Sequence, residues 1–426
     1  MSLVERDQRV VWHPFTQAKT DKAPLPIIKA KDSILTAEDG KEYIDCNSSW
    51  WVNVHGHGNS HIGKAISDQF QKIDHIVLAG ATHPKVVELA ERIIKVLPQD
   101  YSRVFYSDNG STAVEVAIKM VMQYWFNKGI EKKRFLALEG AYHGDTFGAM
   151  SLGQRGYFNK PFESFFFQAD YLPFPSEQRE AECLEKAEKL FKSGEFAGVI
   201  VEPLVQGSAG MQMYRPEFLN GLMKLAKKYD VLFIFDEVMT GWGRTGKMFA
   251  MNHCDDIPDI VCLSKGITGG TLPLGLTVTK EHIFEAFLHD EKTKALLHGH
   301  SYTGNPLACA AACATLDIFE TKESQDNIHR ICERHAAFRS KISGKYKLSD
   351  LRQSGTILAV EIEVEEGSSY FSSIREEAVD FFYANGMLLR PLGNVIFLNP
   401  PYCTTNEQLD HCYDKIEEFL KDKASL

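Results

Sequence analysis

An aspartate and a lysine, 29 residues apart, each follow a short apolar run. Asp236 closes residues 231–235 in VLFIFDEVMTGWGRTG, and Lys265 follows residues 260–263 in DIVCLSKGITGG. A charged group at the edge of a core is costly unless it finds a partner. A carboxylate there suits a protonated pyridine nitrogen, and a lysine amine can form a Schiff base with a carbonyl cofactor. Pyridoxal phosphate meets both requirements.

Each of these residues also has a simpler interpretation. Lys265 is a surface lysine if its stem alone is buried and its ammonium reaches water. Asp236 caps the next segment, or pairs with Arg244, if no ligand is bound. In the functional interpretation, partial desolvation lowers the pKa of Lys265, so that its amine can bind the cofactor and later shuttle a proton between substrate and cofactor.

A polar turn, SDNGS, suggests a phosphate site. Ser107, Asn109, Gly110 and Ser111 follow an apolar run and precede a helix expected from Thr112. The free N–H groups and positive dipole at a helix start bind anions. The same letters also fit an ordinary turn with a helix cap.

The elements that must position these residues alternate between strand and helix patterns. Strands are predicted at residues 104–106, 134–138, 198–201, 231–235 and 260–263. Helices are predicted at residues 112–127, 215–228 and 306–321. This alternation predicts an α/β fold with a mainly parallel sheet, whose ligands gather beyond the carboxyl ends of the strands. The segments at those ends are all polar or rich in glycine.

The two ends of the chain have a different pattern, which predicts a second, smaller α+β domain built from both termini. It mixes β-like patches with charged helical patterns, at residues 357–362, 395–398, 373–385 and 406–420. The predicted division is residues 1–60 and 320–426 for the small domain and 61–319 for the large, cofactor-binding domain.

The composition restricts the class of partner. The chain has 426 residues, 44% of them hydrophobic, and a formal net charge of −10 without a long basic block, which argues against nucleic-acid binding. Nine cysteines occur without a C-x-x-C pair, a pattern typical of reduced thiols in the cytoplasm rather than of disulfides or a metal site. The sequence shows no signal peptide or membrane-spanning run.

Five strings resemble the class III, fold type I pyridoxal-phosphate aminotransferases over nearly the whole chain. They are EGAYHGDT, EPLVQG, DEVMTGWGRTGKMFA, SKGITGG and HGHSYTGNPLACAAA. The resemblance implies a large domain with a mainly parallel, seven-stranded sheet. It also implies that Lys265 forms the Schiff base, that Asp236 meets the ring nitrogen, that Gly110 and Ser111 hold the phosphate, and that Tyr142 stacks on the ring.

The resemblance further implies a shared active site. His300 and Ser301 match positions that contact the cofactor phosphate from the neighbouring subunit, so a homodimer is expected. His143, Asp145, Glu202 and Gln206 are expected around the cofactor, with Asp145 a candidate for binding a substrate amine.

A second group of strings points to the substrate. WHPFTQ, SSWWVNVHGH, QYWFNKG and LLRPLGNVI resemble members of the family that convert 8-amino-7-oxononanoate to 7,8-diaminononanoate in biotin synthesis. The resemblance implies substrate contacts from Trp50, Gly299 and Arg390. An apolar chain ending in a carboxylate needs aromatic walls, which Trp50 and Trp51 supply, and a guanidinium clamp, which Arg390 supplies.

The amino donor expected is S-adenosylmethionine, with lysine as the alternative. Phe15 stands where many users of S-adenosylmethionine have a tyrosine, so stacking is retained but a hydroxyl is lost. His300 and Ser301 resemble the lysine-dependent variant, whereas SSWW and YHGDTFGAM favour S-adenosylmethionine. Other hypotheses are a class III ω-amino acid or diamine aminotransferase, a racemase or mutase, and a non-catalytic binding module.

Overall fold

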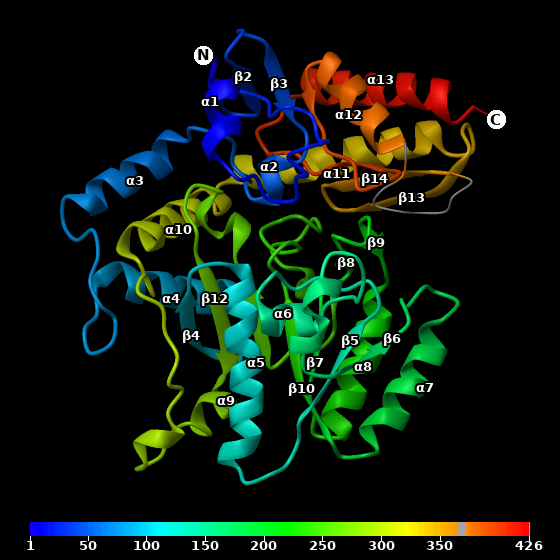
Figure 1. Cartoon of the computed structure of the whole chain (residues 1–426). Coiled ribbons are helices and arrows are strands. Elements are labelled where there is room, and N and C mark those ends of the chain that lie inside the picture. Colours follow the sequence, from blue (N-terminus) through cyan, green and yellow to red (C-terminus); the bar gives the residue numbers. More distant parts are fainter. Residues whose placement is uncertain (365–371, 373, 426) are drawn as a thin grey trace.

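A computed structural model describes residues 1–364, 372 and 374–425, and a seven-stranded sheet forms its centre (Figure 1). The strand order is β4 (Tyr101–Ser107), β12 (Gly275–Lys280), β11 (Ile260–Leu263), β10 (Leu232–Asp236), β7 (Phe196–Val201), β5 (Arg134–Leu138) and β6 (Ala169–Leu172). Neighbouring strands pair in parallel, except that β12 runs antiparallel to both β11 and β4. The predicted α/β fold with a mainly parallel sheet is confirmed, and all five predicted strands are present. The sequence patterns missed β6 and β12.

Helices cover both faces of this sheet, which explains why its inner strands β7, β10 and β11 are almost entirely apolar. Along β10, Ile234 packs into the core beneath α5 (Gly110–Asn127), whereas Phe235 packs into the core on the opposite face. That opposite core includes buried residues of α4 (Pro84–Val96), α7 (Glu180–Phe191), α8 (Pro216–Lys228) and α10 (Pro306–Phe319). Figure 1 shows α5 lying across the front of the sheet.

The carboxyl ends of β10 and β11 lie side by side. Asp236 is paired in register with Cys262, and Lys265 follows three residues later. The aspartate and the lysine that the sequence singles out therefore reach the same edge of the sheet.

Two further sheets are formed by the ends of the chain. One has the order β1 (Ile27–Lys31), β2 (Ile34–Ala37), β3 (Glu42–Asp45) and β15 (Met387–Leu388); the other has β13 (Leu348–Ser354), β14 (Ile357–Ile362) and β16 (Val395–Leu398). The parallel pairing of β3 with β15 joins the amino-terminal and carboxyl-terminal parts. These sheets and α11 (Lys322–Ile342), α12 (Ile374–Ala384) and α13 (Asn406–Lys423) lie above the central sheet in Figure 1. Residue 373 of the predicted helix 373–385 lies outside the described residues, and the boundaries at 60/61 and 319/320 stay predictions.

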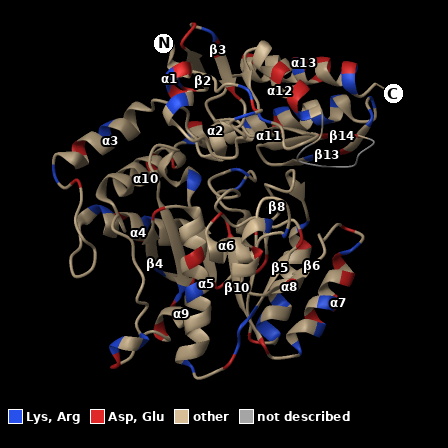
Figure 2. Ribbon diagram, viewed as in Figure 1, with Lys and Arg blue, Asp and Glu red and all other residues tan. Residues whose placement is uncertain are grey.

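The remaining elements connect these parts. They are α1 (Leu3–Val10), α2 (Ser48–Trp51), α3 (Ser60–Phe70), α6 (Phe147–Leu152), α9 (Glu281–Glu285), β8 (Val205–Gln206) and β9 (Gln212–Met213). Figure 2 shows charged residues of both signs along the outer helices. Within the described residues, no helix has the length and apolar character to span a membrane, and no three metal-binding side chains form a cluster.

Candidate active site

A cavity of about 690 Å³ opens at the carboxyl ends of the central strands. Ten residues that the sequence singles out line it: Trp51, Asn109, Gly110, Ser111, Tyr142, His143, Asp145, Glu202, Asp236 and Lys265. A cavity of this size is typical of sites for small ligands.

Lys265 begins a short 3₁₀ helix, Lys265–Thr268, directly after β11. Its backbone has φ +46°, a left-handed conformation that is unusual for a residue with a side chain. Its Nζ atom lies 4.9 Å from the centre of the Trp51 ring. Burial lowers the pKa of Lys265, and the negative charges of Asp236 and Glu202 oppose this only in part. The amine is therefore more easily deprotonated than an ordinary lysine.

Asp236 is buried at the end of β10, with a partner on each oxygen. His143 Nδ1 donates to Oδ2 over 2.8 Å, and the Val238 N–H group donates to Oδ1 over 3.1 Å. Arg244 donates instead to the Pro400 carbonyl over 2.9 Å. The alternative that Asp236 pairs with Arg244 is therefore wrong, whereas the capping bond to the next segment does form.

Glu202 adds a second buried carboxyl group to the cavity. Its oxygens accept hydrogen bonds from the N–H groups of Tyr142, over 2.9 Å, and Gly207, over 3.0 Å. Burial nevertheless raises the pKa of Glu202 to about 7, with Asp236 contributing in the same direction. This carboxyl group can thus exchange a proton near neutral pH, and it also fixes the backbone from which the Tyr142 ring projects.

The Tyr142 side chain is held by a neighbour in the same loop. Its hydroxyl group donates to Asp145 Oδ2 over 2.9 Å. Burial, followed by the charge of Asp145, raises the pKa of Tyr142, so the hydroxyl stays protonated. The side chain is fixed as a neutral ring on the wall of the cavity.

The amino-terminal end of α5 forms another part of the lining. Asn109 caps this helix, because its side chain accepts from the Thr112 N–H group over 2.9 Å and its carbonyl accepts from the Ala113 N–H group over 3.0 Å. The N–H groups of Gly110 and Ser111 precede the first bond within the helix, so they have no helix partner. Two unpaired donors at the positive end of a helix suit an anion such as phosphate.

The predicted substrate residues Phe15, Trp50 and Arg390 form a second cluster. The Phe15 and Trp50 rings lie 5.5 Å apart, and the Arg390 guanidinium lies 5.4 Å from the Trp50 ring. Phe158 packs edge-on against Phe15 at 6.0 Å. These residues do not line the cavity itself, but Trp50 is joined to it through its neighbour Trp51.

Other predicted residues lie away from this cavity. Gly299, His300 and Ser301 are not among its lining residues, and His300 Nδ1 lies 3.7 Å from Asp108 Oδ2. Gln206 is buried and donates to the Glu139 carbonyl over 3.1 Å, so it supports the loop before Tyr142 rather than lining the cavity.

The sequence patterns missed part of the lining, namely residues 270–274, Thr146 and Ser264. Thr146 is tied to the phosphate turn, since its hydroxyl lies 2.9 Å from Ser111 Oγ. The glycine-rich turn that follows Lys265 is the sequence pattern that could have identified residues 270–274 as part of the lining. At Gly270 a Cβ atom would lie 2.9 Å from the Asn53 backbone nitrogen, so only glycine allows this close approach.

Comparisons with known proteins agree on one family. The sequence model described as Aminotransferase class-III matches residues 15–420. The chain is 44% identical over 420 residues to a Synechococcus elongatus protein named adenosylmethionine-8-amino-7-oxononanoate aminotransferase, covering 97% of this chain and 98% of that protein.

Solved structures give the same result. A Methanocaldococcus jannaschii crystal structure with the same enzyme name is 36% identical, superposes with a TM-score of 0.93, and covers 99% of each chain. An amine transaminase from an uncultivated Pseudomonas species, in a PLP-bound form, is 29% identical with a TM-score of 0.91, covering 97% of this chain and 99% of that one.

Proposed function

Because the chain belongs to the class-III aminotransferases, we propose that it binds pyridoxal 5'-phosphate and transfers an amino group to 8-amino-7-oxononanoate. The product is 7,8-diaminononanoate, formed in biotin synthesis. The observation that carries the proposal is the meeting of Lys265, Asp236 and the start of α5 at one cavity.

The polar groups that line this cavity are complementary to those of the cofactor. The N–H groups of Gly110 and Ser111 suit its phosphate, the Asp236 carboxylate suits its protonated ring nitrogen, and the Lys265 amine suits its aldehyde. When bound, pyridoxal phosphate supplies that aldehyde and a ring that withdraws electrons from the carbon beside the reacting amine. Tyr142 bounds the same space and can stack on a flat ring.

Lys265 is the residue that we assign to proton transfer. Its lowered pKa increases the fraction of neutral amine, which is the form that attacks a carbonyl group or accepts a proton. His143 holds the Asp236 carboxylate in place through the hydrogen bond to Oδ2. Because the donor must leave its amino group on the enzyme and depart before the acceptor enters the same site, we expect ping-pong kinetics.

The cluster of Phe15, Trp50 and Arg390 is the proposed site for the acceptor chain. The methylene chain between the carboxylate and the 7-oxo group can lie against the two rings, and the guanidinium can hold the terminal carboxylate by two parallel hydrogen bonds. Trp51 continues the same aromatic wall into the cavity that contains Lys265. The reacting end of the chain would thus enter the cavity while the carboxylate stays outside it.

We further propose S-adenosylmethionine as the donor, with lysine as the alternative. The name shared by the relatives includes adenosylmethionine, and the aromatic surface at Phe15 can stack on an adenine ring. The missing hydroxyl at position 15 removes one hydrogen bond to the substrate, so the donor must be measured directly.

A homodimer with shared sites is the proposed catalytic unit. Gly299, His300 and Ser301 lie in an irregular segment that ends in a turn at residues 301–304, and its apolar side chains are exposed, with Leu297 71% and Tyr302 63% accessible. Exposed large apolar side chains of this kind mark contact surfaces. In the proposed dimer this segment would reach the partner's cavity. The cytoplasmic location expected from the reduced thiols stays a prediction.

One experiment tests the proposed reaction. The purified protein, loaded with pyridoxal phosphate, is mixed with 8-amino-7-oxononanoate and either S-adenosylmethionine or lysine, and the product is identified by mass spectrometry. We expect 7,8-diaminononanoate with S-adenosylmethionine and none with the Lys265→Ala variant. Amination of other ketones by an ω-amino acid or a diamine, without 7,8-diaminononanoate under any condition, would instead assign the chain to another class-III activity.

A further inference from the structure

The segment Ser48–Trp51, here called the tryptophan turn, has a strained backbone. Ser48, Ser49 and Trp51 have φ values of +48°, +60° and +64°. Residues with side chains rarely adopt this left-handed region, and a bulky residue such as tryptophan is a clear outlier there. Such a turn persists only where the surrounding structure fixes it, and strain of this kind concentrates at functional sites.

The carboxylate of Asp45 fixes this turn at its centre. Its Oδ1 atom accepts the Ser49 N–H group over 2.7 Å, and its Oδ2 atom accepts the Ser49 hydroxyl over 2.9 Å. The Asp45 side chain is completely buried, with an exposed fraction of 0%. A buried carboxylate requires such bonds, so Asp45 and the turn determine each other's position.

His57 in turn fixes Asp45. Its Nε2 atom lies 2.9 Å from Asp45 Oδ2, and its Nδ1 atom lies 3.0 Å from Asn53 Nδ2. The backbone of His57 is held by two hydrogen bonds with Asp32, of 2.7 and 2.9 Å. Asp45 is thus clamped between an anchored histidine and the turn.

The tryptophan turn presents both of its rings to the proposed site. Trp51 lines the cavity, where Lys265 Nζ lies 4.9 Å from the centre of its ring. Trp50 lies between Phe15, at 5.5 Å, and Arg390, at 5.4 Å. A change in the backbone at Ser49 would therefore move the wall near the reacting amine and the wall near the guanidinium together.

We propose that Asp45 is a positioning residue for the acceptor substrate, acting through Ser49 on the two tryptophans. This inference rests on the proposed function, because it concerns the site for 8-amino-7-oxononanoate. Without the carboxylate, the strained turn relaxes and the rings lose their places relative to Arg390 and Lys265. Binding of the acceptor should then weaken more than the chemical step slows.

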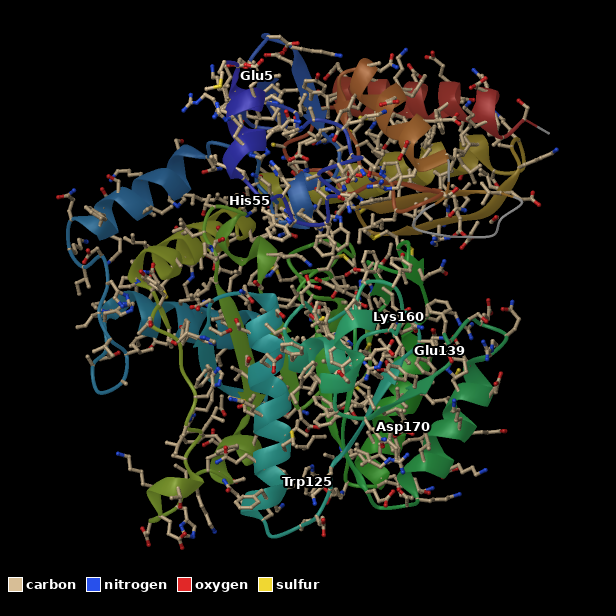
Figure 3. All side chains as sticks on the ribbon, in the orientation of Figure 1. Glu5, His55, Trp125, Glu139, Lys160 and Asp170 are labelled. Atoms are coloured by element: carbon tan, nitrogen blue, oxygen red, sulfur yellow. The ribbon has the colours of Figure 1, made fainter. Side chains whose placement is uncertain are left out.

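The first test uses no substrate. The cofactor-loaded protein is labelled with 5-fluorotryptophan, and its five tryptophans are assigned in ¹⁹F NMR spectra by single Trp→Phe variants. We expect Asp45→Ala to shift the Trp50 and Trp51 signals and leave Trp125 unchanged, since Trp125 lies at the far end of α5 (Figure 3). Asp45→Asn should retain the wild-type signals, because its amide oxygen can still accept the Ser49 N–H group and its NH2 group can donate to the Ser49 hydroxyl and to His57 Nε2. For this His57 carries its proton on Nδ1, and the Asn53 amide turns so that its oxygen accepts that proton.

The second test separates KM from kcat. We expect Asp45→Ala to raise KM for 8-amino-7-oxononanoate roughly 10- to 100-fold while kcat changes by less than about threefold, since small displacements of positioning groups have effects of this size. Asp45→Asn should restore KM to within about threefold. Asp39→Ala is the matched control, because Asp39 is an exposed aspartate that also accepts a backbone N–H group, from Lys41 over 3.0 Å.

A milder variant, Ser49→Ala, removes one of the two bonds to the turn and should act in the same direction if Asp45→Ala does not fold. The proposal is overturned if these variants leave both the tryptophan signals and KM unchanged, or if Asp45→Asn is as impaired as Asp45→Ala. A wild-type protein that does not convert 8-amino-7-oxononanoate contradicts the proposed function alone, because the NMR test still reports on the turn.

Discussion

Gly275→Ala should weaken cofactor binding although Gly275 does not line the cavity. Gly275 is the first residue of β12, beside the turn that leads into α5. A Cβ atom there would lie 2.6 Å from Ser107 Oγ and closer still to the carbonyl oxygen of Asn109. The Ser107 side chain can rotate, but the Asn109 backbone cannot. Since ordinary contact begins at 3.4 Å, that carbonyl group must move by about 1 Å.

This displacement reaches the phosphate turn directly, because the Asn109 carbonyl accepts the Ala113 N–H group at the start of α5. Overpacking of this kind costs about 1–3 kcal/mol. If this strain destabilises the cofactor-bound protein but not the cofactor-free protein, the Kd for pyridoxal phosphate rises roughly 5- to 150-fold.

The assay is a titration of the cofactor-free protein with pyridoxal phosphate, followed by tryptophan fluorescence, together with urea unfolding in the absence of cofactor. Gly63→Ala is the matched control, since Gly63 lies in α3 with no atom within 4 Å of an added Cβ. A Gly275→Ala protein that binds the cofactor within twofold of wild type would refute the reasoning.

Three further predictions concern the substrate, the acid stability and the core. Arg390→Leu should raise KM for 8-amino-7-oxononanoate about 10- to 100-fold in steady-state assays, and Arg390→Lys should not restore it, because lysine lacks the planar fork. Burial lowers the pKa of His335 to about 3, below its value in the unfolded chain, so the stability that it contributes is present above about pH 6.5 and lost as the pH falls. Urea unfolding of wild type should therefore lose up to about 1.4 kcal/mol per pH unit more than His335→Gln between pH 6 and 4. Arg244→Met should lower the free energy of unfolding by about 2–4 kcal/mol, because the Pro400 and Asn399 carbonyls lose a buried donor.

The central sheet was predictable from the sequence because its strands are buried on both faces. Continuous apolar runs such as residues 231–235 have few other interpretations when polar turns bound them. β12 is also buried, but its sequence GLTVTK alternates apolar residues with threonine and begins after TLPL, which is typical of a turn. Its antiparallel direction depends on the short connection from Lys265, and periodicity carries no information on strand direction.

The reactive residues of the site were also predictable from the sequence, but the hydrogen bonds that position them were not. Lys265 and Asp236 each follow an apolar run, so their places at one edge of the sheet follow from the fold class. The bond from Glu202 to the backbone of Tyr142 joins segments 60 residues apart in the sequence, and the bonds from Asp45 to Ser49 form only because the backbone turns sharply between them. Such bonds depend on loop conformations that single-residue preferences do not specify, as the left-handed backbone of Ser49 illustrates.

The electrostatic polarity of the cavity explains why its two ends suit one cofactor. Asp236 and Glu202 gather negative charge at the ends of β10 and β7, and burial partly relieves it by raising the pKa of Glu202 to about 7. The start of α5 adds its positive dipole end to the lining of the same cavity. A ligand with a cationic ring nitrogen at one end and a phosphate at the other satisfies both. Because strand ends and helix starts meet at the same edge of a parallel sheet, the fold itself imposes this polarity. The features that distinguish this chain from other class-III aminotransferases therefore lie in the acceptor site, on the tryptophan turn and at Arg390.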